Sequence, residues 1–527
     1  MSTDAPSLPN DVETLQSMVA EQSSTIEQLT SKLTKLEHHL QQLLRARYGP
    51  RGEKIDPNQL ALFETSGEVK SPSEGGQPEP VTVIKEHRRG GGGRKKLPDH
   101  LPREIIEHDL SSQEKCCPDC GHERSRIGEE ASEQLEYTPP VLKVLRHLRF
   151  KYACRHCGEQ VQVAPPVPKP IAKGLAGPGL LAALVTSKYA DHLPLYRLED
   201  IFARSGVEIP RSTLCRWALA TAEILRPLQQ LMIERVLQSK VIHTDDTPMP
   251  VLDPELSKTR TARLWVYAGD WQNQYTVYDY TTSRKRDGPV EFLKGFSGYL
   301  QADAYGGYDG IYAAGAVQQV LCWAHARRKF FEARTVQPEE AHAALAFIAR
   351  LYDVERTLSD ERYPVHETSN LRHIMRRWHR TRRRRRQKES LPTLAEFHEW
   401  LQAAQHRVLP KSPVGQAIGY VLPRWQGLVR YCEDGVLSID NNLSERMIRP
   451  LAIGRKNYLF FGSDDGGRAA AVLYSVMASA KTYHLEPFAY VRGLLETFSQ
   501  NVDPDLDKLL PDIWLAAHPE YRRNRPR

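Results

Sequence analysis

The feature that most constrains the fold is a series of apolar, strand-like runs in the middle of the chain. These runs cover residues 240–248, 263–268, 275–280, 298–305 and 317–325. The first three follow one another closely and predict an antiparallel meander, whereas a helical stretch precedes the fourth run and another precedes the fifth. We therefore expect a mixed sheet with helices on both of its faces.

Acidic residues, Asp245 and Asp303, stand near the ends of the first and the fourth of these runs. A meander followed by strand, helix and strand is typical of an RNase H-like core, in which acids at the ends of the first and fourth strands lie side by side. A third acid from a later helix would complete the site, and Glu445 is placed to do so. Asp246 is an alternative to Asp245, because successive side chains of a strand point to opposite faces.

The segment 438–463 predicts the helix that carries Glu445. Asp440 or Asn441 can cap this helix. Glu445 and Arg449 then share one face, with Asn442 and Arg446 beside them. This pattern indicates one half of a metal and phosphate site. The alternative is a capped surface helix with an ordinary Glu–Arg pair.

The stretch between Asp303 and Glu445 is too long for one helix and a loop. Residues 337–435 have a helical pattern with breaks at Pro392 and Pro410, so we expect a helical insertion over 336–435. Residues 372–388 hold nine Arg and one Lys without an acid. We expect phosphate to neutralise this run, with DNA contacts from Arg382, Arg383 and Arg384. A solvated helix face or a nuclear-localisation-like tract is the alternative.

The N-terminal residues 11–47 carry apolar residues at alternating steps of three and four, and only Gln22 interrupts them. This heptad pattern predicts a coiled coil over 1–48 with another copy of the chain as its partner. Gln22 would help to set the register. The alternative is one amphipathic helix packed on its own protein.

Polar, Gly- and Pro-rich sequence follows, and predicts a flexible linker over 49–100. Near its end a run of four glycines leads into Arg94, Lys95 and Lys96. A basic, Gly-rich arm can bind in a DNA minor groove. A solvated linker explains the composition equally well.

Two C-x2-C pairs, each followed by Gly, predict a structural zinc site in a ribbon over 101–165. The four thiolates belong to Cys117, Cys120, Cys154 and Cys157, with strand-like runs at 133–137 and 141–152 between the pairs. Four protein ligands leave no open position for catalysis. Cys116 and His122 are lower-ranked alternatives.

Residues 166–236 are predicted to form a helical DNA-binding domain. Two helices over 195–205 and 211–223, joined by a Gly-containing turn, resemble a helix-turn-helix. Ser212 or Thr213 would cap the second helix, and Arg211 and Arg216 near its start would contact DNA. Any hairpin of two helices has a similar pattern.

The composition sets limits on the class of protein. The net charge of +7 is a weak argument for a polyanionic partner. A run of about 18 apolar residues and a signal pattern are both lacking, so we expect a soluble, cytoplasmic protein. In such a chain, eight cysteines favour metal ligation over disulfides.

The motifs together resemble those of insertion-sequence-66-type DDE transposases along nearly the whole chain. The resemblance is carried by 243–251 around Asp245, 298–305 around Asp303, 322–330 with His325, 439–446 around Glu445, 454–460, and the two cysteine pairs. It implies a multidomain α/β chain, with catalytic core parts over 237–335 and 436–495 and a C-terminal tail over 496–527.

The resemblance also implies the chemistry. Asp245, Asp303 and Glu445 would hold Mg(II) or Mn(II), and Asp245 is favoured over Asp246 because the family pattern is Asp, a second acid and Thr. DNA hydrolysis at the element end would be followed by attack of the freed 3′-hydroxyl on target DNA. The implied DNA contacts on the Glu445 side are Asn442, Arg446, Arg449, Arg455 and Lys456. His325 is expected to be structural, although it could position a nucleophile.

The implied partners are the element ends, target DNA, another copy of the chain and accessory proteins of the same element. The implied location is the bacterial nucleoid while the chain is bound to DNA. Two other functions remain open: a non-catalytic DNA-binding regulator derived from a transposase, and a structure-selective nuclease. The three acids in their expected settings argue against the regulator. The long N-terminal region and the Arg-rich insertion argue against the nuclease.

Overall fold

The computed structural model describes the segment 167–172 and residues 174–523, except for 254, 257, 361–370 and 502. Before these it describes short pieces, namely 11, 16–19, 22–26, 29, 142, 144–146, 151–153 and 161–163. The described residues from 151 onward belong to the larger of two compact units of the chain. In the described residues, no helix is long and apolar enough to cross a membrane.

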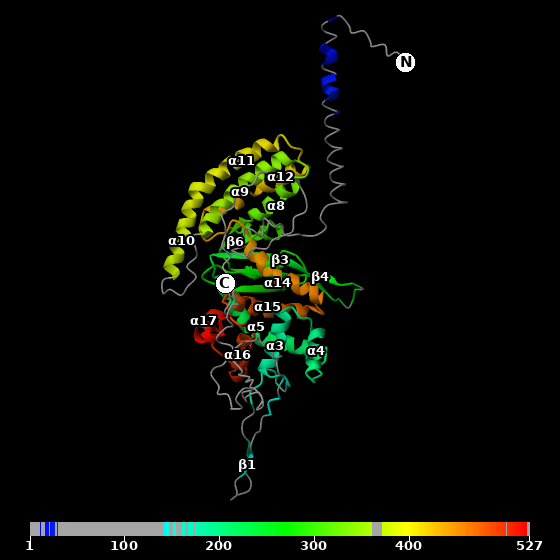
Figure 1. Cartoon of the computed structure of the whole chain (residues 1–527), viewed down its shortest axis with the longest axis vertical. Helices are drawn as coiled ribbons and strands as arrows, with labels where there is room; N and C mark the ends of the chain where they lie inside the picture. Colours follow the sequence, from blue (N-terminus) through cyan, green and yellow to red (C-terminus); the bar gives the residue numbers. More distant parts are fainter. Residues whose placement is uncertain are drawn as a thin grey trace, which may run out of the picture. The chain divides into compact units, whose positions relative to one another are not determined.

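A five-stranded mixed sheet forms the centre of the larger unit (Figure 1). Its strands are β3 Val241–Val251, β4 Arg260–Ala268, β5 Thr276–Thr281, β6 Gly298–Ala302 and β7 Val317–Leu321, in the order β5-β4-β3-β6-β7. β3, β4 and β5 pair antiparallel, whereas β3, β6 and β7 pair parallel. The predicted meander and the predicted mixed sheet are confirmed.

Helices α5 (Arg211–Leu237) and α15 (Asp464–Thr482) cover one face of the sheet. Gln229 of α5 donates to the carbonyl of Tyr278 on β5 at 3.0 Å, and the Ser475 hydroxyl of α15 accepts from the Tyr278 N–H at 2.8 Å. The Tyr278 ring also packs against Tyr474 of α15, with centroids 5.8 Å apart. Tyr278 shares its row of the sheet with Val266 and Asp245, so the Asp245 side chain points to this face.

Short helices cover the opposite face. These are α6 Asp287–Phe292, η1 Gly306–Tyr308 and α7 Asp309–Ala313. The ring of Phe292 stacks on Tyr267 of β4 with centroids 3.6 Å apart, and Tyr308 packs edge-on against Trp265. Helices therefore lie on both faces, as the order of the elements predicts.

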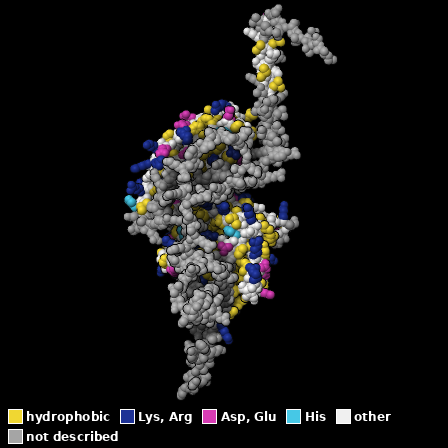
Figure 2. Space-filling model, viewed as in Figure 1, with side chains coloured by type: hydrophobic (Ala, Val, Ile, Leu, Met, Phe, Trp, Pro, Cys, Tyr) yellow, Lys and Arg dark blue, Asp and Glu magenta, His cyan; other side chains and the backbone are white. Residues whose placement is uncertain are grey.

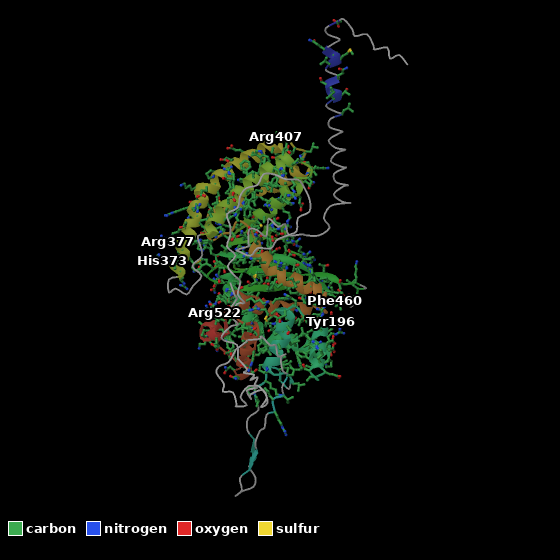
Figure 3. The ribbon with its side chains drawn as sticks, viewed as in Figure 1. Tyr196, His373, Arg377, Arg407, Phe460 and Arg522 are labelled. Carbon is green, nitrogen blue, oxygen red and sulfur yellow. The ribbon has the colours of Figure 1, made fainter. Side chains whose placement is uncertain are left out.

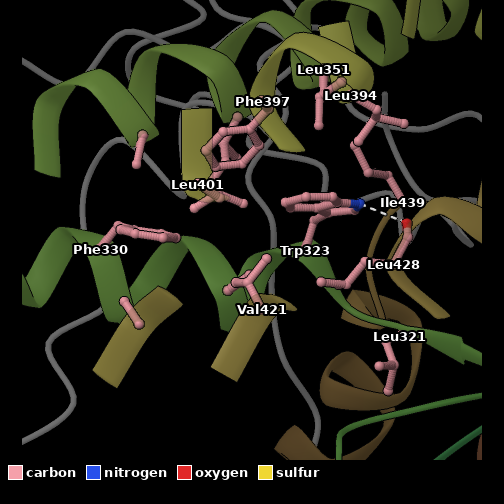
Figure 4. Packing of buried hydrophobic residues seen from close by; sticks show 14 of the residues in the cluster. Leu321, Trp323, Phe330, Leu351, Leu394, Phe397, Leu401, Val421, Leu428 and Ile439 are labelled. Carbon is pink, nitrogen blue, oxygen red and sulfur yellow. Dashed lines mark hydrogen bonds between the residues drawn. The ribbon is translucent and has the colours of Figure 1, made fainter. Parts of the chain in front are cut away.

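The insertion between β7 and the helix of Glu445 is helical, as expected. It contains α8 Trp323–Ala333, α9 Pro338–Asp360, α10 Leu371–Arg385, η2 Arg386–Ser390, α11 Leu391–Gln405, α12 Pro413–Val421, η3 Leu422–Arg424, α13 Trp425–Val429 and η4 Arg430–Cys432. One apolar cluster joins these helices to the sheet (Figure 4). At its centre Trp323 is fully buried and donates its indole N–H to the carbonyl of Leu428 at 2.8 Å.

The expected helix break at Pro392 is wrong. α10 continues through the π-helical turn η2 into α11, and Pro392 lies in the first turn of α11. A proline lacks the N–H that an α-helix would use, and the wider turn just before it accommodates the ring. Pro410 does lie in a break, between α11 and α12.

The remaining helices pack below the sheet in Figure 1. They are α3 Pro178–Tyr189, α4 Leu195–Arg204, α16 Pro487–Gln500, η5 Leu506–Leu509, α17 Pro511–Ala517 and η6 Pro519–Tyr521. α4 and α5 match the two expected helices in their starts. α5 extends past the expected residue 223 to Leu237, because its second half packs on β5 and α15.

Only short pieces of the N-terminal regions are described. β1 (Lys151–Ala153) pairs antiparallel with β2 (Val161–Val163), so these strands flank the second cysteine pair. Residues 16–19, 22–26 and 29 are helical, and Val19, Ile26 and Leu29 of the heptad pattern are exposed. The rest of the predicted coiled coil lies outside the described residues.

Candidate active site

The sheet brings the first two predicted acids together. Asp245 lies in β3, and Asp303 directly follows the end of β6. These strands are parallel neighbours in which His243 is paired with Gln301. Each acid is two residues beyond that pair, so Asp245 and Asp303 lie next to each other on the same face.

Glu445 reaches the same place from the first turn of α14 (Asn442–Tyr458), the orange helix that packs on β3 and β4 in Figure 1. The pKa of Asp245 is raised to about 7, mainly by burial and in addition by the carboxylates of Asp303, Asp246 and Glu445. The Asp246 N–H, 2.7 Å from Asp245 Oδ1, acts in the opposite direction. The three predicted acids therefore form one electrostatically coupled group.

Burial also raises the pKa of Asp303. The Tyr305 N–H donates to its Oδ1 at 3.2 Å, and His325 and Arg284 act to lower that pKa. His325 Nε2, in the first turn of α8, is 4.0 Å from Glu445 Oε1. This residue thus stands beside two of the acids.

Asp246 has a different environment on the opposite face. Its side chain is 3 % exposed and forms ion pairs with Arg263 at 2.9 Å and Arg284 at 2.8 Å. Arg284 also lies over the Tyr305 ring at 4.2 Å and approaches Asp303 to 3.9 Å. Sequence reasoning missed both arginines, which lie 17 and 38 residues beyond Asp246.

The side chain of Gln301 fixes the segment that leads into α14. Its Nε2 donates to the carbonyls of Ser438 at 2.6 Å and Asp440 at 2.9 Å, while its Oε1 accepts from the Ser438 N–H at 3.1 Å. Gln301 is fully buried two residues before Asp303. The sequence offers one weak signal for this role, a polar residue within an apolar strand.

Asn441 makes a second connection between β3 and α14. Its Nδ2 donates to the Thr244 carbonyl at 2.8 Å, and its Oδ1 lies 3.3 Å from His243 Nδ1. Burial lowers the pKa of His243 to about 4. The imidazole is therefore neutral near pH 7 and can donate its Nδ1–H to Asn441. These contacts hold the start of α14 against the strand that carries Asp245.

Of the two residues predicted to cap α14, Asp440 is the one whose side chain bonds to the helix start. Asn441 occupies the N-cap position without a side-chain cap bond, whereas Asp440 Oδ1 accepts from the Asn442 N–H at 3.2 Å. The Asp440 carboxylate also accepts from the Tyr352 hydroxyl of α9 at 3.2 Å. Asp440 therefore satisfies the helix start, and Asn441 is used for the contact with β3.

The donor set suits a divalent cation. Carboxylate oxygens are the ligands that Mg(II) prefers, and a cation would relieve the repulsion that raises the pKa of Asp245. Among the described residues, no three His, Cys, Asp or Glu side chains are grouped closely enough to hold one ion together. Binding would therefore have to draw the side chain of Asp303 or Glu445 closer to Asp245.

The predicted DNA-contacting residues of α14 divide into two groups. Arg446, Arg449 and Lys456 are exposed. Arg455 instead turns toward β3, where it donates to the Thr247 hydroxyl at 3.2 Å and to the Pro248 carbonyl. Asn442 is partly buried, and its Nδ2 donates to Asp440 Oδ2 at 2.8 Å.

The arginine run also divides. Arg383 and Arg384 are exposed, and Figure 2 shows Lys and Arg side chains along the outer edge of the insertion. Arg382 forms an ion pair with Glu355 at 2.9 Å and donates to the Gly435 carbonyl, whereas Arg385 pairs with Glu389 at 3.0 Å. The expectation that phosphate neutralises the whole run is therefore wrong.

Arg386 explains why part of the run is structural. Its side chain is fully buried and makes two bonds with the Glu355 carboxylate, at 2.6 and 2.8 Å. Its Nη1 donates to the carbonyls of Tyr431, Asp434 and Leu437. Burial alone would raise the pKa of Glu355, but Arg386 and Arg382 hold it at about 2.

The other residues predicted to contact DNA lie at the start of α5 or in the N-terminal part of the chain. Arg211 and Arg216 are exposed in the first turns of α5. Neither Ser212 nor Thr213 caps this helix; the Arg211 N–H instead donates to Glu199 of α4 at 3.1 Å. Arg94, Lys95, Lys96 and the four predicted zinc ligands lie outside the described residues.

Family models match this chain in three regions. One described as "Transposase IS66 family" matches residues 173–469, more than half of the chain. One described as "zinc-finger binding domain of transposase IS66" matches 114–158, and "Transposase C of IS166 homeodomain" matches 35–106. The second match contains both cysteine pairs, and the first contains all three acids.

Relatives in Sinorhizobium fredii match most of the chain. "Uncharacterized protein y4jD" is 30% identical over 532 residues, which cover 98% of this chain and 99% of the relative. "Uncharacterized protein y4qI" is 34% identical over 441 residues, which cover 80% and 78%. Together with the family models, these matches show that the chain belongs to the IS66 transposase family.

Proposed function

We propose that this chain is the enzyme that cuts DNA at the ends of an insertion sequence and joins those ends to target DNA. The proposal is supported by the adjacency of Asp245 and Asp303 on the paired strands β3 and β6, and by Glu445 in the first turn of α14, which packs on β3. The strand order supports an RNase H-like core around them. The influence of the Asp303 and Glu445 carboxylates on the pKa of Asp245 also supports the grouping.

Asp245, Asp303 and Glu445 would hold the divalent cations, whereas Asp246 pairs with Arg263 and Arg284. Two such cations, when bound, would activate a water or a 3′-hydroxyl and stabilise the oxygen that leaves the phosphodiester. Gln301 and Asn441 position the start of α14 and hence the Glu445 carboxylate. His325, 4.0 Å from Glu445, orients that carboxylate.

The rest of the chain would bind and pair the DNA ends. Arg446, Arg449 and Lys456 are exposed on the helix of Glu445, and Arg211 and Arg216 are exposed on α5. Such side chains suit phosphate contacts. We assign Cys117, Cys120, Cys154 and Cys157 to a structural zinc site, and the N-terminal heptads to a coiled coil that joins two copies.

A non-catalytic regulator is the alternative. A strand-transfer assay separates the two, using purified chain, a labelled duplex with the element end, and a supercoiled target. Joined products with Mg(II) but not with EDTA are expected for the enzyme. Specific binding of the end without products, even after accessory proteins of the element are added, would support the regulator.

A further inference from the structure

The C-terminal end of α14 presents exposed apolar side chains. Leu459 is 62% exposed and Phe460 is 40% exposed, and Figure 3 labels Phe460. Leu252, whose N–H donates to the Phe461 carbonyl at 2.9 Å, is 45% exposed beside them. This group, Leu252, Leu459 and Phe460, is called the apolar tip below.

The backbone at the tip is strained. Leu459 has φ 60° and ψ −47°, and the Phe460 N–H donates to the Tyr458 carbonyl at 2.6 Å. These values define a γ-turn with positive φ, a rare and strained conformation that glycine adopts more easily than leucine. Both the strain and the exposure of the leucine are unfavourable in the isolated chain. The fold alone therefore gives no reason for a large apolar side chain here.

The turn is held firmly on both sides. Before it, Asn457 donates to the His192 carbonyl at 3.0 Å, and Lys188 lies 4.3 Å over the Tyr458 ring. After it, Phe461 is buried and its N–H donates to the Pro250 carbonyl at 2.9 Å. The apolar tip is consequently a preformed projection, which loses little conformational freedom when it binds a partner.

The apolar tip continues a basic stripe that starts next to the candidate active site. The exposed residues of α14 are Arg446, Arg449, Ile453 and Lys456. Their spacing of three, four and three places them along one face of the helix. A DNA backbone that follows this stripe from Glu445 would reach the tip. This charge pattern favours nucleic acid over an apolar protein surface as the partner.

We propose that Leu459 and Phe460 form a wedge that inserts between base pairs and unstacks one step of the element end. Apolar side chains flanked by cationic ones act in this way in DNA-bending proteins. The helix rises about 1.5 Å per residue, so the tip lies about 20 Å from Glu445. That length corresponds to about six base pairs at 3.4 Å each. The inference rests on the proposed function and adds to it the position at which the DNA is distorted.

Fluorescence of 2-aminopurine tests the wedge. The base is placed at successive positions of an element-end duplex, and the full chain is bound without Mg(II). Unstacking should raise the fluorescence several-fold at one step, about six base pairs from the cut phosphate. Leu459→Gly and Phe460→Ala should abolish the rise and weaken binding about tenfold, because stacking on a base is lost. Leu409→Ala, at an exposed leucine of the insertion, is the matched control.

Thermal unfolding separates the wedge from a structural role. Leu459→Gly should keep or raise the melting temperature, because glycine relieves the strain. The wedge would be overturned if Leu459→Gly lowered the melting temperature and left the fluorescence rise unchanged. It would also be overturned if this variant, without DNA, no longer associated with itself. A wild-type chain that joins DNA without a fluorescence rise at any step would also overturn it, leaving the proposed function intact. Failure of the wild type to bind element ends would overturn both.

Discussion

Asp245 and Asp246 are adjacent in β3, yet their carboxylates belong to different sites. Asp246 is tied to Arg263 and Arg284 by ion pairs of 2.9 and 2.8 Å. Asp245 faces α14 and is influenced by the carboxylates of Asp303 and Glu445. The pairing of β3 with β4 decides this division, because neighbouring residues of a strand point to opposite faces.

Substitution of the two aspartates should have opposite effects. Asp245→Asn should abolish strand transfer without loss of stability, because it removes a buried charge that has acidic neighbours. Asp246→Asn should lower the free energy of unfolding by about 2 kcal/mol, because two arginines lose their charged partner. Urea unfolding and the joining assay measure the two effects. Equal loss of stability in both variants would contradict the division.

The raised pKa of Asp245 predicts a pH dependence in metal-free protein. Its pKa rises from 3.8 to about 7 on folding, so the folded chain binds the proton more tightly than the unfolded chain. The resulting stabilisation is complete below about pH 4 and is lost as the pH rises through about 7. The melting temperature of Asp245→Asn relative to wild type should therefore increase between about pH 5 and about pH 8. If the difference in melting temperature between Asp245→Asn and wild type stayed constant over this pH range in EDTA, the Asp245 carboxyl would have an ordinary pKa.

Gln301 should matter for activity through the position of Glu445. Gln301→Leu removes three hydrogen bonds to the segment before α14 and leaves buried carbonyls unpaired. We expect a loss of about 2 kcal/mol in stability and a loss of strand transfer, with end binding retained. Gln318→Leu, at an exposed glutamine of β7, is the matched control. Full activity in Gln301→Leu would remove it from the positioning of Glu445.

The arginine run should separate into structural and DNA-binding members. Arg386→Lys should lower the free energy of unfolding by about 3 kcal/mol, because lysine cannot replace the paired bonds to Glu355 and the three carbonyl contacts. Circular dichroism during denaturation measures this loss. An unchanged unfolding midpoint would contradict the buried ion pair.

Arg383 and Arg384 should matter for DNA binding and not for stability. The double variant Arg383→Ala with Arg384→Ala should keep its stability and bind DNA more weakly. The slope of log K against log salt should fall by about 2 if both side chains contact phosphate. Filter binding over a series of salt concentrations measures the slope. An unchanged slope would place DNA elsewhere than on the insertion.

The sequence predicted the sheet and the helical insertion because their patterns are local. Hydrophobic periodicity marks each strand, and the strand order follows from short connections. The acids were singled out because Asp245 and Asp303 belong to apolar, strand-like runs and Glu445 lies near the start of a helix. The expectation that Asp245 ends its strand is wrong, because β3 continues to Val251. Long-range polar contacts were not found: Glu355 pairs with Arg386 across 31 residues, and Gln301 reaches Asp440 across 139.

Side-chain periodicity also left the choice between Asp245 and Asp246 open. Alternation shows that the two point apart, but only the partners on each face decide which one meets Glu445. Those partners come from β4, the loop before α6 and α14. The strained turn at Leu459 was equally hidden, because leucine does not mark a positive φ.

Strand transfer by three conservative variants tests the central claim most directly. Asp245→Asn, Asp303→Asn and Glu445→Gln are each compared with wild type and with Glu291→Gln, at an exposed glutamate of α6. The assay uses a labelled element end, a supercoiled target and Mg(II), and end binding is measured in parallel. The account predicts joined products from wild type and Glu291→Gln, and none from the three variants, which still bind the end. Wild-type yields of joined DNA from any of the three would contradict the assigned catalytic group.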